Sequence, residues 1–451
     1  MRYSAIDLFA GCGGLSDGFH NAGFDIIAQI DMDKWACESL RTRHLFYELK
    51  ARKKNIFYTK YLKGLISKDQ IIKNFPDVEI SIRHRVIQGV FGKDNTDELI
   101  SKIEKNMEFH CINKVNVFLG GPPCQPYSLI GRARDQQRMQ YDERHFLYTH
   151  YLNLIEHFQP DFFIYENVPG LFSAKANGQK IFLKILEDFA SLQPSYEITP
   201  PLEKIYEDPH GYVLNSADFF IPQNRKRLVL IGYRSDLYNK NQEIKDIFKK
   251  LQESGLENRK RGFFSVKDAI GDLPELKPGE GDNGFFGAYS KNENLSVYQK
   301  KMRKFSPGIL NHMARTHMQS DIDRYRFFIE HHQNGEKSAN LIDLIQKRPD
   351  LIPQHKHLDK FVDRFKVQWW TRPSSTITAH ISKDGHYFIH PDIDQCRSFT
   401  VREAARCQSF PDNFFFEGPR TEQFRQVGNA VPPLLAEAIG RAVIRELEKI
   451  Y

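Results

Sequence analysis

Short apolar runs of strand length recur along the first half of this chain, and the segments between them are long enough for helices. The runs are residues 3–10, 24–30, 115–119, 161–165 and 228–232. Strands that alternate with helices favour a parallel α/β sheet, because each crossover helix returns the chain to the same edge of the sheet. We therefore expect a sheet with helices on both faces.

The alternation stops near residue 235, and the following stretch is richer in charged, histidine and aromatic residues. We expect residues 1–235 to form the first domain, with an insertion of helices at about 45–113 whose role the sequence does not indicate. Residues 236–424 are predicted to form a smaller mixed domain. Apolar residues spaced three and four apart predict a last helix within 425–451, which returns to the first domain.

Composition constrains the partners only weakly. The chain has 64 Lys and Arg against 57 Asp and Glu, a formal net charge of +7. This excess is compatible with binding to nucleic acid, but many soluble enzymes share it.

The six cysteines form no CxxC pair, so we expect no zinc site. No apolar stretch approaches 20 residues and no signal peptide is visible, so we expect a cytoplasmic protein without a membrane segment.

A glycine-rich turn follows the first apolar run, in the segment Asp7-Leu8-Phe9-Ala10-Gly11-Cys12-Gly13-Gly14. Glycines let the backbone approach a ligand closely, and exposed N–H groups can hold an anionic group. Asp31 lies 20 residues after Gly11, at the end of the second run, where a carboxylate can accept both ribose hydroxyls. The pattern is GxGG and not GxGxxG, which favours another nucleoside ligand over a dinucleotide. A tight turn with a solvated aspartate is the structural alternative.

A proline-rich loop around one cysteine follows the third run. Residues 120–128 read Gly-Gly-Pro-Pro-Cys-Gln-Pro-Tyr-Ser, and arginines follow at 132, 134, 138 and 144. Cys124 would lie at a strand end, where α/β enzymes place reactive groups. A thiol becomes a good nucleophile when it is deprotonated, which a cationic setting favours. A lone cysteine is more often a small buried apolar residue; the flanking prolines favour the reactive interpretation.

Two further polar groups adjoin strands. Glu166 follows the run 161–165, and Gln223-Asn224-Arg225-Lys226-Arg227 precedes the run 228–232. Each could be a solvated surface feature. However, polar groups at several strand ends converge on one site when the strands share a sheet.

These stretches resemble the DNA cytosine-C5 methyltransferase family, of the bacterial restriction–modification type. The similar stretches are DLFAGCGG (7–14), GGPPCQPYS (120–128), ENVPG (166–170), QNRKRL (223–228), RPSSTITAH (372–380) and VGNAVPP (427–433). They occur in the family's order. The resemblance does not cover residues 45–113 or most of 236–370.

The resemblance implies a Rossmann-like S-adenosylmethionine-dependent methyltransferase sheet with a smaller target-recognition domain. The implied activity is methyl transfer to C5 of cytosine in a specific duplex DNA sequence, after the base is flipped out of the stack. By the same resemblance, Cys124 would add to C6 and Glu166 would bind N3 and the exocyclic amine. Arg225 would contact the cytosine carbonyl, and Arg227 would support the nucleophile or the DNA backbone.

The resemblance also assigns residues to the methyl donor. The implied positions are Phe9, Ala10, Gly11, Gly13, Gly14, Asp31, Met32, Pro123, Asn429 and Ala430. Met32 would cover the adenine. One departure stands out: the family usually has an Asp-Ile or Asp-Val pair where the adenine amine is held, and this chain aligns Val90-Phe91 there.

The implied partner is double-stranded DNA, with a cognate restriction endonuclease that acts separately, and we expect a monomer without a metal. Candidate DNA contacts are Gln125, Ser128, Arg132, Arg134 and Gln223. The specificity region, about 236–370, offers His312, Arg315, His317, Arg324, Arg326, His331 and His332 for phosphate and base-edge contacts.

Alternatives to this function stay open. Relatives with the same motifs modify tRNA, and the long segment 236–370 favours DNA over tRNA. A DNA-binding protein on a decayed methyltransferase fold would be expected if Cys124, Glu166 or Arg225 were replaced, and all are present. A dinucleotide oxidoreductase would explain the glycine turn but not the loop around the cysteine.

Overall fold

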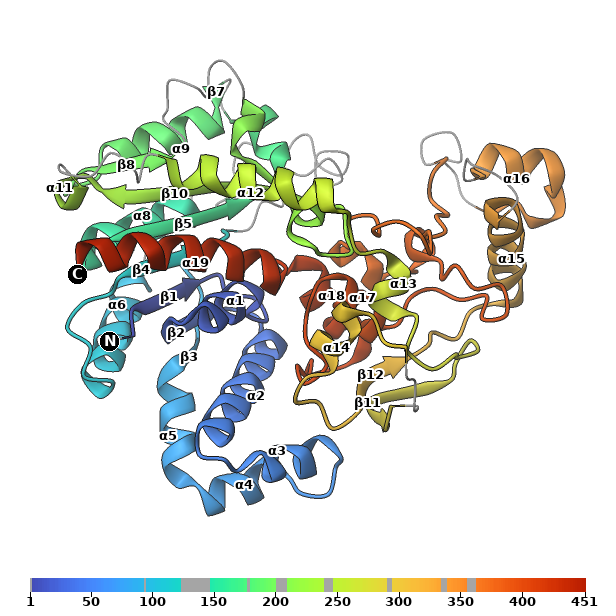
Figure 1. The fold of residues 1–451 in the computed structure, drawn as a ribbon, viewed down its shortest axis with the longest axis horizontal. Helices are drawn as coiled ribbons and strands as arrows, with labels where there is room; N and C mark the ends of the chain where they lie inside the picture. The colour runs from blue at the N-terminus through green and yellow to red at the C-terminus, as the bar shows by residue number, and fades with distance from the viewer. Residues whose placement is uncertain are drawn as a thin grey trace.

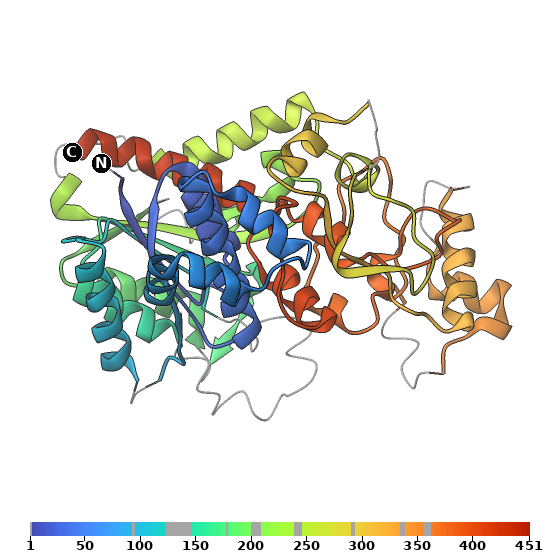
Figure 2. The same cartoon turned by 90° about the horizontal axis from the view of Figure 1, so that it is seen from below.

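The computed structural model describes residues 2–92, 95–122, 147–176, 179–199, 209–238, 246–289, 294–333, 339–354 and 362–451. These residues form two lobes, and at the junction residues 222–224 of the larger lobe pair with Ser374 of the smaller one (Figure 1). The N- and C-terminal ends lie side by side on the larger lobe, where the rings of Tyr3 and Tyr451 are 6.2 Å apart (Figures 1 and 2).

The larger lobe is built on one mixed sheet with strand order β3-β2-β1-β4-β5-β10-β8, and β9 also pairs with β10. The bounds are β1 Ser4–Leu8, β2 Asp25–Asp31, β3 Val86–Gln88, β4 Val117–Gly120, β5 Phe162–Asn167, β8 Tyr196–Thr199, β9 Val213–Asn215 and β10 Lys226–Arg234. Strand residues of this sheet are buried on both faces, which explains why the runs are apolar without alternation.

The strand directions confirm the predicted parallel sheet only in part. Strands β3, β2, β1, β4 and β5 run parallel, but β10 runs antiparallel to both β5 and β8. A fully buried strand reads as a continuous apolar run in either direction, so the run 228–232 could not indicate its direction. The parallel prediction was wrong for this strand.

Helices cover both faces of the sheet, as predicted. One face buries Ala5, Val117 and Val229 against α1 (Gly14–Ala22), α12 (Ile247–Arg261) and α19 (Pro433–Ile450). The other face buries Ile6 and Phe118 against α6 (Thr96–Phe109), α8 (Leu147–Phe158) and α9 (Ile181–Ala190). Successive strand residues point to opposite faces, so neighbouring positions enter different cores. Two small additions to this lobe are the hairpin β6 (Lys175–Ala176) and β7 (Gln179–Lys180), and α11 (Ser235–Tyr238).

The second lobe has its own core around α17 and α18, a hairpin of β11 and β12, and an outer pair of helices, α15 and α16, at its far end (Figure 2). The bounds are α13 Val266–Ile270, β11 Gly281–Gly287, α14 Val297–Arg303, β12 Ile309–Met313, α15 Gln319–Gln333, α16 Leu341–Lys347, α17 Val401–Cys407 and α18 Arg420–Asn429.

The packing favours lobe boundaries different from those expected at 236 and 424. Phe248 and Leu251 of α12 lie in the core of the large sheet, with Ile231 of β10. Phe424 and Val427 of α18 lie in the core of the second lobe. We therefore propose that the second lobe extends from about residue 262 to 430.

The helical insertion, whose role the sequence did not indicate, packs against the second lobe. It contains α3 (Asn55–Leu62), α4 (Lys68–Asn74) and α5 (Pro76–Arg85), and it follows the long helix α2 (Lys34–Ala51). Tyr58 and Leu62 share a core with Leu310 of β12, against which Phe285 and Phe415 also pack. Figure 1 shows these helices below the sheet, reaching toward the β11–β12 hairpin. The insertion thus ties the two lobes together.

Glu417 is the main polar anchor of this contact. Its carboxylate accepts hydrogen bonds from Thr42 and from Tyr61 Oη (2.7 Å) and forms an ion pair with Lys68 Nζ (2.9 Å). Tyr58 Oη donates to the backbone carbonyl of Asn413 at 3.0 Å. A carboxylate that is largely removed from water and accepts several hydrogen bonds contributes more than an exposed ion pair does.

We expect Glu417→Gln to lower the free energy of unfolding by about 1–3 kcal/mol, because a neutral amide cannot replace the charged acceptor for three donors. Urea unfolding would measure the change. Glu422→Gln is the matched control, since Glu422 pairs only with the exposed Arg425 and such pairs contribute about 0–1 kcal/mol. Equal losses in the two variants would contradict a role of Glu417 in joining the lobes.

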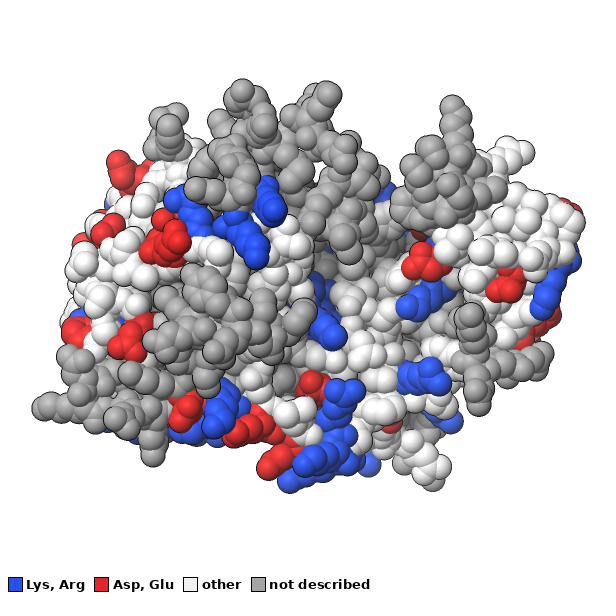
Figure 3. Space-filling view, turned by 90° about the horizontal axis from the view of Figure 1, so that it is seen from above, with Lys and Arg blue, Asp and Glu red and all other residues white. Residues whose placement is uncertain are grey.

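The surface offers cations near the junction. Seen from above, Lys and Arg side chains lie on both lobes and between them (Figure 3). Within the described ranges, no helix combines the length and the apolar character needed to cross a membrane.

Candidate active site at the junction of the lobes

Polar groups from several strands meet at one edge of the sheet. The register pairs Leu8 of β1 with Gly120 of β4, and Gly120 with Tyr165 of β5, so the carboxyl ends of these strands are level. Strand β10 is antiparallel, and its Leu228 pairs with Asn167. The residues at the start of β10 therefore lie beside the residues that end β5, which brings two of the three predicted strand-end groups together.

The glycine turn has one open position and two crowded ones. A Cβ on Gly11, whose φ is +54°, would meet no atom within 4 Å. A Cβ on Gly13 would lie 2.5 Å from Leu40 Cδ2, and one on Gly14 would lie 2.2 Å from the carbonyl oxygen of Val431. Gly13 and Gly14 are therefore needed for packing, whereas Gly11 borders open space that a ligand can enter.

Asp31 is held next to that space. Its carboxylate accepts hydrogen bonds from the backbone N–H of Gly11 (2.7 Å) and from that of Asp33 (2.8 Å). Burial raises the pKa of this carboxyl, against the lowering effect of both N–H groups. A carboxylate has about four acceptor positions, so two remain for the hydroxyls of a ribose.

Two exposed apolar side chains flank Asp31. Met32 is 65% exposed, and Val90 is 52% exposed in the loop that follows β3. The N–H of Gly89 donates to the carbonyl of Asp31 at 3.0 Å, which fixes the two loops beside each other. Phe91 is buried, with its ring 4.4 Å from that of Phe9. Exposed apolar side chains on both sides of a polar anchor suit a flat, partly apolar ligand.

The end of α18 closes the other side of the turn. A Cβ on Gly14 would lie 3.3 Å from Ala430 Cβ, so Ala430 packs on the turn, and the neighbouring Asn429 is exposed. Gly11 and Asp31 thus lie on one side of the turn, and Ala430 packs on the other.

Glu166 and Arg227 form an ion pair at the adjacent strand ends. Arg227 Nε lies 2.8 Å from Glu166 Oε1, and the side chains are 10% and 14% exposed. A Cβ on Gly121 would lie 2.8 Å from Glu166 Oε2. Asn167 Nδ2 donates to the carbonyl of Pro122 at 3.3 Å. The loop that leads to the predicted nucleophile therefore starts against Glu166.

The position of Arg225 does not fit the expected contact with the base. Its side chain is fully buried, and it donates to the carbonyl oxygens of Ile377 (2.5 Å) and Gly428 (3.1 Å). Burial lowers the pKa of its guanidinium, and the charge of Arg227 lowers it further. The geometry favours Arg225 as a link between segments that meet at the junction, and Arg227 as the arginine that accompanies Glu166.

Gln223 also differs from its expected role as a DNA contact. It is fully buried, and its amide donates to Gln408 Oε1 (2.9 Å) while accepting from the N–H of Ile377 (2.8 Å). The N–H of Asn224 donates to the carbonyl of Ser374 at 2.8 Å. Residues 223–225 therefore bind the stretch 374–377 across the junction. The motif RPSSTITAH contained this partner, but nothing in its residue types indicated the pairing.

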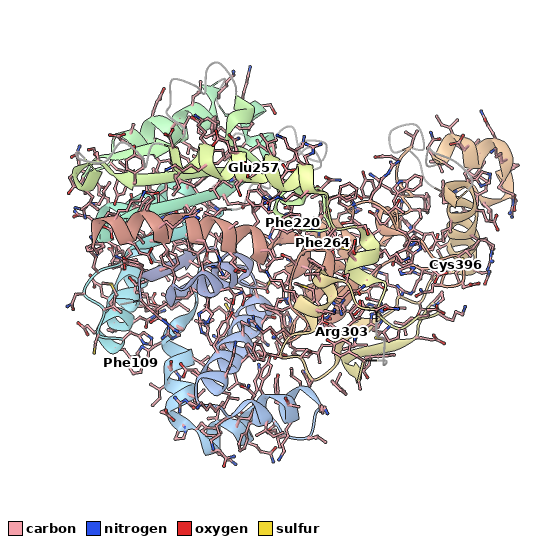
Figure 4. All side chains as sticks on the ribbon, viewed as in Figure 1. Phe109, Phe220, Glu257, Phe264, Arg303 and Cys396 are labelled. Atoms are coloured by element: carbon pink, nitrogen blue, oxygen red, sulfur yellow. The ribbon has the colours of Figure 1, made fainter. Side chains whose placement is uncertain are left out.

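An aromatic contact reinforces the junction. Phe220 comes from the large lobe and Phe264 from the start of the second, and their ring centroids are 5.9 Å apart (Figure 4). Phe264 also lies 5.2 Å from the ring of Tyr298.

The central residues of the cysteine loop lie outside the described residues. They are Pro123, Cys124, Gln125, Ser128, Arg132 and Arg134. Their roles stay predictions.

Several residues expected to read DNA are instead internal to the second lobe. His312 is hydrogen-bonded to Thr400, and Arg315 donates to the backbone carbonyls of residues 381–383. His317 contacts Ser398, and Arg324 bonds Asp321 and the Leu351 carbonyl. Their predicted DNA contacts do not fit this burial; Arg326 is exposed.

Over the described ranges, no three His, Cys, Asp or Glu side chains gather to hold a metal ion.

Because several histidines of the second lobe are buried, we expect acid to destabilise that lobe. Burial lowers the pKa of His312 and of His317 to about 4, and that of His390 to about 3. In an unfolded chain the pKa of histidine is about 6.5. The stabilisation is therefore complete above about pH 6.5 and is lost as the pH falls toward 4, because only the unfolded chain takes up these protons.

We expect the free energy of unfolding to fall by up to about 1.4 kcal/mol per pH unit for each such histidine. Urea unfolding between pH 7.5 and 5.5 would measure this, since Glu403, whose pKa is lowered, stays ionised there. His390→Gln should reduce the slope. A flat profile in that range would contradict the prediction.

Comparisons with known proteins identify the family of this chain. The family model described as C-5 cytosine-specific DNA methylase matches residues 3–85 and 85–445. The chain is 38% identical to the type II methyltransferase M.Bpa9945I of Bacillus paralicheniformis, over 97% of this chain and 98% of that protein. It is 30% identical to the type II methyltransferase M.DdeI of Desulfomicrobium norvegicum, over 99% and 89%. A crystal structure of a prophage-encoded protein described as a DNA modification methyltransferase, from E. coli, aligns with a TM-score of 0.62 at 22% identity, over 99% and 100%.

Proposed function

The chain belongs to the C-5 cytosine-specific DNA methylase family, and from this premise we propose which of its residues carry the reaction. It is an enzyme that transfers a methyl group to C5 of cytosine in DNA, and its family depends on S-adenosylmethionine. The observation that carries the residue assignment is the ion pair between Glu166 and Arg227, next to the start of the cysteine loop.

We assign the methyl donor to the space bordered by Gly11, Asp31, Met32 and Asn429. Asp31 has acceptor positions left for ribose hydroxyls, and Gly11 leaves room for a ligand against the backbone. The first N–H groups of a helix have no partner within the helix, so those at the start of α1 can hold a carboxylate. When bound, S-adenosylmethionine supplies an electrophilic methyl group.

We assign the nucleophile to Cys124. It follows Pro122 by two residues, and two residues span at most about 7 Å. The Pro122 carbonyl is bonded to Asn167, which adjoins Glu166 in β5. Pro122, the last described residue before Cys124, therefore lies beside the residues that end β5, which supports the assignment. A nearby cation favours the thiolate, which is the reactive form.

We assign recognition of the flipped base to Glu166 and Arg227. Glu166 can accept a hydrogen bond from the exocyclic amine and, when protonated, donate to ring N3. Arg227 can donate to the cytosine carbonyl. Groups placed where charge develops on the reacting ring usually supply the largest share of catalysis. Arg225 holds the junction instead of touching the base.

The covalent cycle then follows. The Cys124 thiolate adds to C6 of the ring, and the electron pair of the C5–C6 double bond becomes available at C5. C5 would then take the methyl group from the bound donor, whose sulfur would keep the electron pair of the broken S–CH3 bond, and a base would remove the C5 proton. The electrons of that C–H bond restore the double bond and expel the thiolate, so Cys124 is regenerated.

We propose duplex DNA as the substrate and the second lobe as its reader. The relatives are named type II methyltransferases. A cognate restriction endonuclease and a monomeric state are therefore proposals for this chain. The cations on both lobes can contact phosphates along a duplex (Figure 3).

A transfer assay decides between DNA and tRNA. Enzyme incubated with methyl-labelled cofactor should label duplex DNA, and tRNA should stay at background. Omission of the enzyme and heat-denatured enzyme are the controls. Label that enters only tRNA would contradict the DNA assignment.

A further inference from the structure

The glycine turn and Asp31, to which the methyl donor is assigned above, belong to different elements. Gly11 and Gly13 lie between β1 and α1, whereas Asp31 ends β2. One donor molecule can contact both only if their separation is fixed. The N–H of Ala10 donates to the carbonyl of Ile30 at 3.0 Å, so a backbone bond joins the beginning of the turn to β2. The other end of the turn, where α1 begins, needs a link of its own.

Two buried side chains supply that link from beneath the turn. Gln29, two residues before Asp31 in β2, donates from Nε2 to Ser16 Oγ in the first turn of α1 at 2.5 Å. The Ser16 hydroxyl donates to the carbonyl oxygen of Gly13 at 3.3 Å. A Cβ on Gly13 would lie 3.1 Å from Gln29 Nε2 and 3.2 Å from Ser16 Oγ. The strand that carries Asp31 is therefore joined to the end of the glycine turn.

A histidine fixes the orientation of the Gln29 amide. His44 of α2 donates from Nε2 to Gln29 Oε1 at 2.5 Å, and burial lowers the pKa of this ring well below its usual range. Asp7, which pairs with Gln29 across β1 and β2, is also hydrogen-bonded to Ser16. All four side chains are at most 7% exposed. The hydrogen bonds therefore run in one direction, from His44 through Gln29 to Ser16 and the turn.

Packing alone does not require these polar side chains. A buried polar group costs free energy unless it is hydrogen-bonded, and apolar side chains of similar size would fill the same volume without that cost. Hydrogen bonds are directional, so a fully paired buried chain fixes the relative position of its elements more narrowly than apolar contact does. The elements that this chain fixes are the two that border the donor site.

We propose that Ser16 and Gln29 are positioning residues for the methyl donor, which hold the start of α1 at the distance from Asp31 at which one donor molecule contacts both. Both side chains are buried, so they act through the turn and do not touch the donor. Without the link, binding must itself order the turn, and this ordering lowers the affinity. Once the donor is bound, the reacting groups lie as before, so the rate at saturation is kept.

Calorimetric titration of the full-length protein with S-adenosylhomocysteine, without DNA, tests this. Ser16→Ala and Gln29→Met should each raise the dissociation constant by about 5–20-fold, which corresponds to about one buried hydrogen bond. The KM for S-adenosylmethionine should rise by the same factor, with kcat within about twofold of the unaltered enzyme. Unchanged affinity would overturn the proposal. If Gln29→Met does not fold, Ser16→Ala, which removes only a hydroxyl group, decides.

Asn106→Leu is the matched control, because it removes a similar buried amide outside the donor site. Asn106, 3% exposed near the end of α6, is hydrogen-bonded to the ring and to the backbone carbonyl of His84. Urea unfolding should show comparable losses of stability in Asn106→Leu and Gln29→Met, but only Gln29→Met should bind S-adenosylhomocysteine more weakly. An equal loss of affinity in the control would overturn the proposal, since affinity would then merely follow stability.

The double variant tests whether the two residues form one link. Because Ser16 and Gln29 act through the same hydrogen bond, the variant with both Ser16→Ala and Gln29→Met should bind within about twofold of the weaker single variant. Two effects that multiply would mean that the residues act separately, and the proposed link would be wrong.

Asp31→Ala separates this proposal from the donor site on which it rests. This variant loses the assigned ribose acceptor and should bind S-adenosylhomocysteine at least about 10-fold more weakly. If it does so while Ser16→Ala and Gln29→Met bind like the unaltered protein, only the positioning role fails. If Asp31→Ala keeps full affinity, the assignment of the donor site fails, and the positioning role with it.

Discussion

Cys124→Ala should abolish methyl transfer, with a loss of at least about 10⁴-fold, because alanine offers no atom that can add to C6. Affinity for duplex DNA should change by no more than a few-fold, since the phosphate contacts remain. Incorporation of labelled methyl groups and a gel-shift titration on the same protein would measure both quantities.

Cys111→Ala provides the matched control for the nucleophile. Cys111 is a free, exposed cysteine in the segment that leads into the start of β4, whereas the assigned groups lie at the carboxyl ends of the strands. Its substitution should leave the rate and the DNA affinity unchanged. Methylation by Cys124→Ala at a rate near that of the control would refute covalent catalysis by this thiol.

The second large effect is expected at Arg225, which precedes β10, and at Arg227, the second residue of β10, and the two should respond in opposite ways. Arg227→Ala should lower kcat by about 10²–10³-fold, because it removes a donor from the place where charge develops, and it should lower stability much less. Arg225→Ala should lower the free energy of unfolding by about 2–4 kcal/mol. It leaves the buried carbonyls of Ile377 and Gly428 without their donor and opens a cavity.

Each variant is the control for the other, because the same substitution is made two residues apart. Single-turnover rates and urea unfolding would be compared for both. A stable, inactive Arg225→Ala together with an active, unstable Arg227→Ala would show that their roles are the reverse of those proposed here.

The apolar runs predicted the strands of the sheet, because a strand that is buried on both faces reads as a continuous apolar run. They did not predict the direction of β10, because a buried strand reads alike both ways. Yet this direction explains the site: because β10 is antiparallel, Arg227 near its start lies beside Glu166 near the end of β5.

Motifs indicated which residues matter but not which ones face solvent. Gln223, Arg225 and His312 have residue types suited to nucleic acid, and all three are buried and bonded inside the protein. Their partners are backbone carbonyls or side chains distant in sequence. Such pairs depend on how the two lobes meet, and no local pattern records that.

The helical insertion shows the same limit. Glu417 and Tyr61 lie 356 positions apart and meet only because the insertion reaches the second lobe. Periodicity could predict helices there, but the surface they pack on is set by the tertiary fold.

Covalent attack on the cytosine ring is tested most directly with DNA that carries 5-fluorocytosine at the methylated position. After methyl transfer C5 holds fluorine instead of a proton, so no base can remove it and the thiolate cannot leave. With S-adenosylmethionine present, intact-protein mass spectrometry should show an adduct with the DNA strand, and peptide mapping should place it on Cys124. Active enzyme that forms no adduct on this DNA, or an adduct at another residue, would contradict the account.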